Sequence, residues 1–139
     1  MGRAEQLAWA AGLYEGEGSI YLDRSDQRRR DGRVRIGMSL STTDQDVAMC
    51  FWDYVRVGAV FGPYTAAKGT KPYWTWHLRN ATQVKALATE LAPLLSIRRR
   101  KQIAEALSEK ATADVNYQPK PLGPRRLPRI AAGQERLTW

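Results

Sequence analysis

Residues 10–18 read Ala-Ala-Gly-Leu-Tyr-Glu-Gly-Glu-Gly, and this segment constrains the fold of the chain more than any other. It follows residues 4–9, which have the composition of a helix, and small residues on a helix face let a second backbone approach closely. Gly16 and Gly18 then end the helix and hold Glu17 between them. A carboxylate fixed at a helix end is suited to holding a hard cation. The segment therefore predicts a closely packed helix whose last turn carries a candidate metal ligand.

The length and composition of the chain indicate one intracellular domain. Its 139 residues, 43% of them hydrophobic, are enough for a modest core. The sequence contains no apolar run of about 18 residues, so no membrane span is expected, and its first residues lack a signal-peptide pattern. Cys50 is the single cysteine, which excludes an internal disulfide and a cysteine zinc site. We therefore expect a cytoplasmic protein with no membrane partner.

The charge of the chain favours nucleic acid as its partner. Lysine and arginine together number 22 against 14 acidic residues, which gives a net charge of +8 and a pI of about 10.0. Basic proteins of this size usually bind nucleic acid. The chain lacks the strongly amphipathic, lysine-rich helix that is typical of a membrane surface. A cation at Glu17 is therefore expected to act on a phosphate.

Hydrophobic periodicity predicts helices that alternate with β-hairpins. Apolar residues at helical spacing predict helices at residues 4–15, 47–55, 82–91 and 97–111. Alternation of apolar and polar residues predicts strands at residues 19–24, 33–41, 59–64 and 73–79. A capping box is expected at residues 43–46, before the second helix. Each hairpin has one apolar face for the helices and one polar or basic face, and a β-ribbon of that kind fits the major groove of DNA. Trp74 and Trp76 share a face with Leu78, so we expect them in the core.

The last part of the chain differs in composition. Residues 113–139 hold four of the seven prolines and several arginines. We therefore divide the chain into a domain at residues 1–112 and an extended, basic, proline-rich tail at residues 113–139. The tail arginines Arg125, Arg126 and Arg129 either wrap a DNA duplex or belong to a disordered segment.

Residues 10–18 also carry a family resemblance, because they align without a gap with the LAGLIDADG motif. Four positions are identical to the motif: Ala11, Gly12, Leu13 and Gly18. The other five positions differ, and three of them have Ala10 for leucine, Tyr14 for isoleucine and Gly16 for alanine. Glu15 and Glu17 replace the two aspartates. Residues 41–44, 61–64, 71–74 and 94–102 are also similar to this family, so the resemblance covers roughly residues 4–110.

The resemblance implies an α+β fold of αββαββα order, in which an antiparallel sheet forms a DNA-binding saddle with the helices packed behind it. It implies a site-specific homing endonuclease that takes part in intron homing. Such an enzyme hydrolyses phosphodiester bonds on both strands of a long, pseudo-palindromic double-stranded DNA site. It uses a divalent metal and has no small-molecule substrate. Because this chain has one motif, the resemblance further implies a homodimer.

The resemblance assigns roles to individual residues around the motif. Glu17 corresponds to the metal ligand of the family, helped by the backbone carbonyl of Gly18. The expected ion is Mg²⁺, which needs only one or two protein carboxylates, and Mn²⁺ or Ca²⁺ would substitute in binding. Glu15 corresponds to the more structural acid. Arg98 matches a basic active-site position, although the run Arg98-Arg99-Arg100-Lys101 leaves open which residue points inward. Thr42 lies near a position that orients water, and its alternative is a simple cap for the second helix.

Packing of the first helix against a second copy would bring two Glu17 side chains together. The residues assigned to this dimer interface are Ala8, Ala11, Gly12 and Glu15. The candidate DNA contacts come from the outward strand positions, the hairpin tip, the start of the last helix and the tail. They are Tyr21, Asp23, Arg24, Arg28, Arg29, Arg30, Arg33, Arg35, Ser39, Tyr73, Thr75, His77, Arg99, Arg100, Lys101, Arg125 and Arg126.

Other classes of protein fit the sequence less well. His77 is the single histidine, so a histidine-metal nuclease is not expected, and residues 16–19 lack the lysine of a P-loop. The serious alternative is a non-catalytic protein of the same fold, either a DNA-binding regulator or an RNA maturase. Glu17 discriminates between the two, because a pure binder gains nothing from a carboxylate that faces phosphates.

Overall fold

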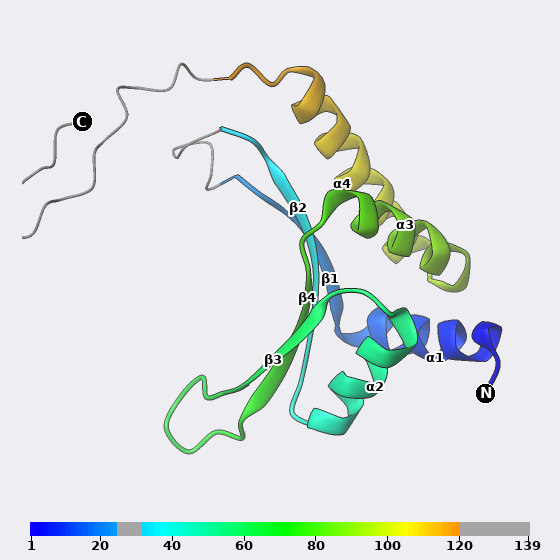
Figure 1. Ribbon diagram of the computed structural model, residues 1–139, viewed down its shortest axis with the longest axis vertical. Coiled ribbons are helices and arrows are strands. Elements are labelled where there is room, and N and C mark those ends of the chain that lie inside the picture. The colour runs from blue at the N-terminus through cyan, green and yellow to red at the C-terminus, as the bar shows by residue number, and fades with distance from the viewer. Residues whose placement is uncertain (25–31, 120–139) are drawn as a thin grey trace, which may run out of the picture.

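The computed structural model describes residues 1–24 and 32–119, and it has the α+β architecture that the sequence predicts (Figure 1). The elements within those ranges are α1 (Arg3–Glu17), β1 (Gly18–Asp23), β2 (Arg35–Thr42), α2 (Gln45–Val55), β3 (Ala59–Tyr64), β4 (Tyr73–Leu78), α3 (Ala81–Leu91), the short 3₁₀ helix η2 (Ala92–Leu94) and α4 (Ile97–Val115). None of the helices in this part of the chain is long and apolar enough to cross a membrane.

The four strands form one antiparallel sheet in the order β1-β2-β4-β3. In the ladder, Ser39 lies opposite Ser19 on one side and opposite His77 on the other. Figure 1 shows all the labelled helices on the same side of the sheet. The sheet curves so that its other face is concave, and no helix of the described part of the chain covers that face. The alternation along the strands therefore divides the sheet into a helix-covered face and an open face.

The core lies between the sheet and the helices. Ile36, Met38 and Leu40 alternate along β2 toward the helices and are at most 1% exposed. Trp76 of β4 is fully buried, packs edge-on against Phe51 at 4.9 Å between ring centroids, and donates its indole N–H to the Val57 carbonyl at 2.9 Å. The prediction of a core position is thus confirmed for Trp76. Trp74, in contrast, is only half-buried.

The junction between α1 and β1 requires a glycine. Tyr14 is 1% exposed, and burial raises the pKa of its hydroxyl to about 12. A Cβ atom at Gly18 would lie 2.1 Å from the Tyr14 ring, well inside van der Waals contact. The helix can therefore pass directly into the strand only because residue 18 has no side chain.

Three boundaries differ from the sequence prediction. Helix α2 begins at Gln45 with Asp44 as its N-cap and no side-chain cap hydrogen bond, so the capping box expected at residues 43–46 is not formed. Helix α1 runs on to Glu17, two residues beyond the predicted end. Helix α4 continues to Val115, so the domain boundary placed at residue 112 falls inside a helix and is wrong. The remainder of the predicted tail, from residue 120 on, lies outside the described residues.

We expect Gly18→Ala to destabilise the fold, because the added methyl group overlaps the buried Tyr14 ring. Overpacking of this kind costs about 1–3 kcal/mol, which lowers the melting temperature by several degrees. Thermal unfolding followed by circular dichroism measures the change. Gly12→Ala is the matched control, because nothing lies within 4 Å of its added methyl group and alanine stabilises a helix interior by about 0.5–1 kcal/mol. Equal melting temperatures for Gly18→Ala and the parent would contradict the packing described here.

Candidate active site and nucleic-acid surface

The last turn of α1 presents an exposed carboxylate. Glu17 is the final residue of the helix, and the N–H of Gly18 donates to the Tyr14 carbonyl to close the turn. The Glu17 side chain is exposed and makes no hydrogen bond or ion pair with any other described residue. Nearby, a Cβ atom at Gly16 would meet nothing within 4 Å. The Glu17 carboxylate is therefore accessible to a cation or to water.

The donor set at this helix end fits a hard cation that keeps most of its own water. Within the described residues, no group of three or more histidine, cysteine, aspartate or glutamate side chains gathers to form a complete metal cage. One carboxylate from Glu17 and the adjacent Gly18 carbonyl are too few to enclose an ion. They match Mg²⁺, which typically binds one or two carboxylates together with waters and substrate phosphates.

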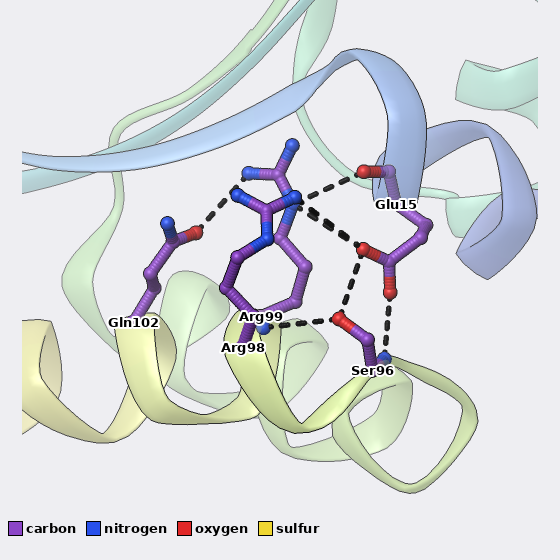
Figure 2. A network of polar contacts seen from close by, with 5 residues as sticks. All are labelled: Glu15, Ser96, Arg98, Arg99 and Gln102. Carbon is purple, nitrogen blue, oxygen red and sulfur yellow. Dashed lines mark hydrogen bonds and ion pairs between the residues drawn. The ribbon is translucent and has the colours of Figure 1, made fainter.

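Glu15 joins the end of α1 to the start of α4 (Figure 2). Its carboxylate accepts a hydrogen bond from the backbone N–H of Ser96 at 2.6 Å and another from the Ser96 hydroxyl at 3.0 Å. Ser96 is also the N-cap of α4, where the partial positive charge of the helix favours a carboxylate. The hydrogen bond from the Ser96 backbone, with further help from Arg99 and Arg98, holds the pKa of the Glu15 carboxyl below its ordinary value of 4.5.

Arg99 is the arginine of the basic run that turns inward. Its side chain is 12% exposed, and its Nε–H donates to the backbone carbonyl of Glu15 at 3.1 Å. Its guanidinium lies 5.8 Å from the centre of the Tyr14 ring and donates to the Gln102 side chain at 3.2 Å. The geometry therefore argues against the predicted DNA contact of Arg99, because its side chain is largely buried and its hydrogen bonds are used within the fold.

Arg98 points outward at the start of α4. Its side chain is 65% exposed, and its guanidinium lies 3.8 Å from the Glu15 carboxylate. Arg100 and Lys101, the other two cations of this run, are also exposed. Arg99 thus packs against α1, whereas Arg98 is exposed beside the Glu15 carboxylate. The active-site role of Arg98 stays a prediction.

Thr42 is occupied by a local turn. It ends β2, and its hydroxyl accepts the backbone N–H of Asp44 at 3.2 Å just before α2. Strand alternation places Thr42 on the same face as buried Leu40, away from the open face of the sheet. This bond closes a local turn and does not cap α2, whose N-cap has no side-chain hydrogen bond. Because the turn occupies the Thr42 hydroxyl, we drop the assignment of Thr42 as a water-orienting residue.

The open face of the sheet gathers the outward strand residues that the sequence selected. The cross-strand pairs Tyr21 with Gly37, Asp23 with Arg35, and Ser39 with His77 all alternate with the buried positions. Tyr21 requires Gly37 opposite, because a Cβ atom there would lie 2.6 Å from the tyrosine ring. The result is a polar and aromatic surface with a cation at Arg35.

Two residues on this face that the sequence predicted to contact DNA differ in accessibility. Thr75 is only 6% exposed, and its hydroxyl is hydrogen-bonded to that of Ser41 at 2.9 Å, so we remove it from the predicted DNA contacts. His77 is partly buried beside a hollow of about 540 Å³ that Phe61 and Tyr64 also line. Burial, with a smaller contribution from Arg79, lowers the pKa of His77. His77 is therefore neutral near pH 7 and able to form hydrogen bonds without adding charge.

The remaining basic candidates lie at the ends of the strands or outside the described residues. Arg24 forms an exposed ion pair with Glu109 of α4 at 3.4 Å, and Arg33 lies 4.7 Å from the centre of the Tyr117 ring. Tyr73 is partly exposed on β4. The predicted contacts Arg28, Arg29, Arg30, Arg125 and Arg126 lie outside the described residues.

The outer face of α1 exposes part of the predicted interface. Ala8 and Gly12 are exposed one turn apart. Ala11 is 1% exposed in the chain's own core, so its assignment to a dimer interface is wrong. Sequence reasoning also missed two exposed apolar residues on either side of Ser96, namely Leu94 at 51% and Ile97 at 77% exposure.

The sheet order, the helices on one face and the acid-bearing end of α1 together define a class of protein: the chain has the fold of the LAGLIDADG homing endonucleases. The homing endonuclease I-CvuI in complex with its target has a TM-score of 0.61 and 16% identity, over 81% of this chain and 69% of that chain. The archaeal intron-encoded homing endonuclease I-Vdi141I complexed with DNA has a TM-score of 0.58 and 14% identity, over 81% and 73%.

A third solved structure is the LAGLIDADG meganuclease I-AabMI bound to uncleaved DNA, with a TM-score of 0.59 and 15% identity. The match covers 79% of this chain but only 38% of that one, so this chain spans less than half of the larger protein. No family model and no curated protein matches the sequence. At these identities the likeness establishes the fold, and function has to be argued from the residues of this chain.

The two acids of the last turn should respond differently to neutralisation. We expect Glu15→Gln to lower the melting temperature of the metal-free protein at pH 7, because its carboxylate has lost its charge-assisted hydrogen bonds. Glu17→Gln is the matched control and should be neutral or slightly stabilising, since a negative charge at a helix C-terminus is unfavourable. Thermal unfolding of both variants and the parent measures the difference.

The effect of Glu15 should also depend on pH. A carboxyl whose pKa is lowered by folding stabilises the protein above its unfolded pKa, and that stability is lost as the pH falls through the folded pKa. The gap between the parent and Glu15→Gln should therefore close as the pH falls below 4.5, the ordinary value. A gap that stays constant down to strongly acidic pH would show that the charge of Glu15 does not stabilise the fold.

Proposed function

We propose that the chain is a site-specific, metal-dependent DNA endonuclease that works as a homodimer and cuts both strands of a pseudo-palindromic duplex. The observation that carries the proposal is Glu17, an exposed acid at the end of α1 with no partner among the described residues, in a chain of net charge +8. An exposed carboxylate would repel phosphates if the protein only bound DNA. A divalent cation between the carboxylate and a phosphate removes that repulsion.

The open face of the sheet supports DNA as the substrate. It is concave, carries polar and aromatic side chains, and is not covered by any helix of the described residues. A β-ribbon of this kind can lie in the major groove, where side chains read the edges of base pairs. Exposed Arg100 and Lys101 at the start of α4 are suited to phosphate contacts that fix the register of the duplex.

Each chain residue would have a limited task in hydrolysis. Glu17 and the Gly18 carbonyl would hold Mg²⁺, with Mn²⁺ or Ca²⁺ able to substitute in binding. When bound, the metal would polarise the scissile phosphate and make a bound water more acidic. Arg98 would stabilise negative charge on the phosphate oxygens, since its exposed guanidinium lies on the neighbouring helix.

A second copy of the chain would provide the reaction centre that cuts the other DNA strand. One chain supplies one such carboxylate, whereas a double-strand cut needs a reaction centre at two phosphates. Exposed Ala8 and Gly12 would let the two α1 helices pack closely. The exposed apolar residues Leu94 and Ile97 are further surface that a second copy would cover.

Selection of cleaved sites from a randomised double-stranded DNA library tests the proposed activity. We expect double-strand cleavage in Mg²⁺, none in EDTA, and a selected site with approximate two-fold symmetry. Glu17→Gln should reduce cleavage of that site by about a hundredfold or more while DNA binding is retained, as when one preorganised electrostatic group is removed from an active site. Specific binding without cleavage by the parent protein would favour a regulator or an RNA maturase instead.

The dimer can be tested at the helix face. We expect Gly12→Leu to prevent close approach of two α1 helices, so that the protein becomes monomeric and double-strand cleavage is lost. The added side chain points into open space in a single chain, so the fold should survive. Light scattering and cleavage are compared with Ala86→Leu, a control at an exposed position of α3. A Gly12→Leu protein that remains a dimer and remains active would exclude this interface.

A further inference from the structure

The backbone next to Glu17 does not by itself fix the position of the carboxylate. Glu17 lies between two glycines, and glycine has the greatest conformational freedom of any residue. The space around the Cα of Gly16 is open. A reacting centre nevertheless needs its ligands held to within a fraction of an ångström. Gly18 is held by its hydrogen bond to the Tyr14 carbonyl and by its pairing with Leu40. Contacts from elsewhere in the fold add to this at the open Gly16 side of the last turn.

Two reciprocal contacts hold this turn (Figure 2). A side chain of α1 accepts a hydrogen bond from the backbone of the α4 cap, because the Glu15 carboxylate takes the Ser96 N–H at 2.6 Å. A side chain of α4 donates to the backbone of α1, because Arg99 Nε–H reaches the Glu15 carbonyl at 3.1 Å. This carbonyl belongs to the last turn of α1, whose final carbonyls lack partners within the helix. We call Glu15, Ser96 and Arg99 the helix-end clamp.

Arg99 is held more rigidly than its neighbours in the basic run. Its side chain is 12% exposed, its guanidinium lies against the Tyr14 ring, and Gln102 accepts one of its N–H groups. Tyr14 itself is 1% exposed in the core. The clamp is therefore anchored on the core through Tyr14, the residue before Glu15.

The same clamp also sets the place of Arg98. Arg98 directly precedes Arg99 in the first turn of α4, and its guanidinium lies 3.8 Å from the Glu15 carboxylate. The two exposed groups assigned to the reaction, Glu17 and Arg98, thus come from two helix ends that this cluster of side chains joins. Glu15 contacts Ser96, Arg98 and Arg99 of the neighbouring helix start.

We propose that Glu15, Ser96 and Arg99 are positioning residues that fix Glu17 and Arg98 relative to each other in the geometry required for cleavage. The inference rests on the proposed function of Glu17. Loss of the clamp frees the last turn of α1 but leaves the helix attached, because Ala10, Ala11 and Tyr14 remain buried in the core. The clamp therefore affects the chemical step more than folding or DNA binding.

Arg99→Lys and Glu15→Gln are the variants that test the clamp. Lysine keeps the charge but lacks the Nε–H that reaches the Glu15 carbonyl, and glutamine keeps the shape but removes the charge. Glu105→Gln is the control, since it neutralises an exposed acid of α4 outside the clamp. The measurements are the single-turnover cleavage rate at saturating protein, the DNA dissociation constant in Ca²⁺, and hydrogen–deuterium exchange of residues 15–19 in the metal-free protein.

We expect both clamp variants to cleave about 10- to 100-fold more slowly, the range that a misplacement of about 1 Å produces, with DNA affinity changed by less than about threefold. Exchange at residues 15–19 should accelerate more than exchange in β2, which changes only by the loss of global stability. The double variant should be little slower than either single variant, because both break the same unit. A merely structural role would instead raise exchange throughout the core.

The outcomes separate this inference from the proposed function. If the parent protein does not cleave DNA, or if Glu17→Gln cleaves normally, the proposed function fails, and the exchange data still show whether the clamp holds the helix end. If the parent cleaves and Glu17→Gln does not, while Arg99→Lys and Glu15→Gln cleave at the parental rate with unchanged exchange, the clamp inference is overturned.

Discussion

The joint between the end of α1 and the start of α4 is the contact on which the rest of the candidate site depends. The C-terminal end of α1, which carries partial negative charge, meets the N-terminal end of α4, which carries partial positive charge. A side chain from each helix forms a hydrogen bond with the backbone of the other. Arg99 donates to a carbonyl at the end of α1, and the Glu15 carboxylate accepts from the backbone N–H and the hydroxyl of Ser96, the N-cap of α4. Because both side chains reach across to the other helix's backbone, the joint is specific in geometry as well as in charge. Glu17 and Arg98 owe their mutual placement to it.

Residues along each strand of the sheet alternate between the face that packs on the helices and the open face. Residues such as Met38 and Trp76 fill the core on the helix side, whereas Ser39 and His77 lie on the open side of the same two strands. Substitutions on the open face therefore leave the core intact. On the proposed function, the DNA sequence preference can change in this way without a change of fold. Gly18 lies against the Tyr14 ring and Gly37 against the Tyr21 ring, and a side chain at either position would overlap the tyrosine.

The sequence predicted the order of elements because both periodicities are strong and the helix breakers stand between them. It also identified Glu17, since an acid between two glycines is a local pattern. It could not identify Ser96 as the partner of Glu15, because the two are 81 positions apart. Nor could it predict that Arg98 is exposed and Arg99 is largely buried, because adjacent residues in a basic run differ only in the direction in which their side chains leave the helix. A cap-like Ser96 before α4 was the one local signal for this contact.

The errors have physical reasons that are equally specific. Ala11 was assigned to an interface because it is small, yet its face of α1 packs into the chain's own core. Thr75 follows the outward alternation of β4, but Ser41 takes its hydroxyl and neighbouring side chains cover it. Thr42 was chosen because it lies near a position that orients water in the family. In the structure its hydroxyl accepts the backbone N–H of nearby Asp44 in a turn. In each case packing in three dimensions decided what a one-dimensional pattern left open.

The proposed metal centre shared by two chains is tested most directly by anomalous diffraction from Mn²⁺ in a crystal of the protein bound to its selected DNA site. We predict manganese within about 2.2 Å of Glu17 carboxylate oxygens, beside a scissile phosphate, with the Glu17 residues of two chains meeting across a two-fold axis. Manganese bound away from Glu17, or a single chain on the DNA, would contradict a metal-dependent homodimer built around the end of α1.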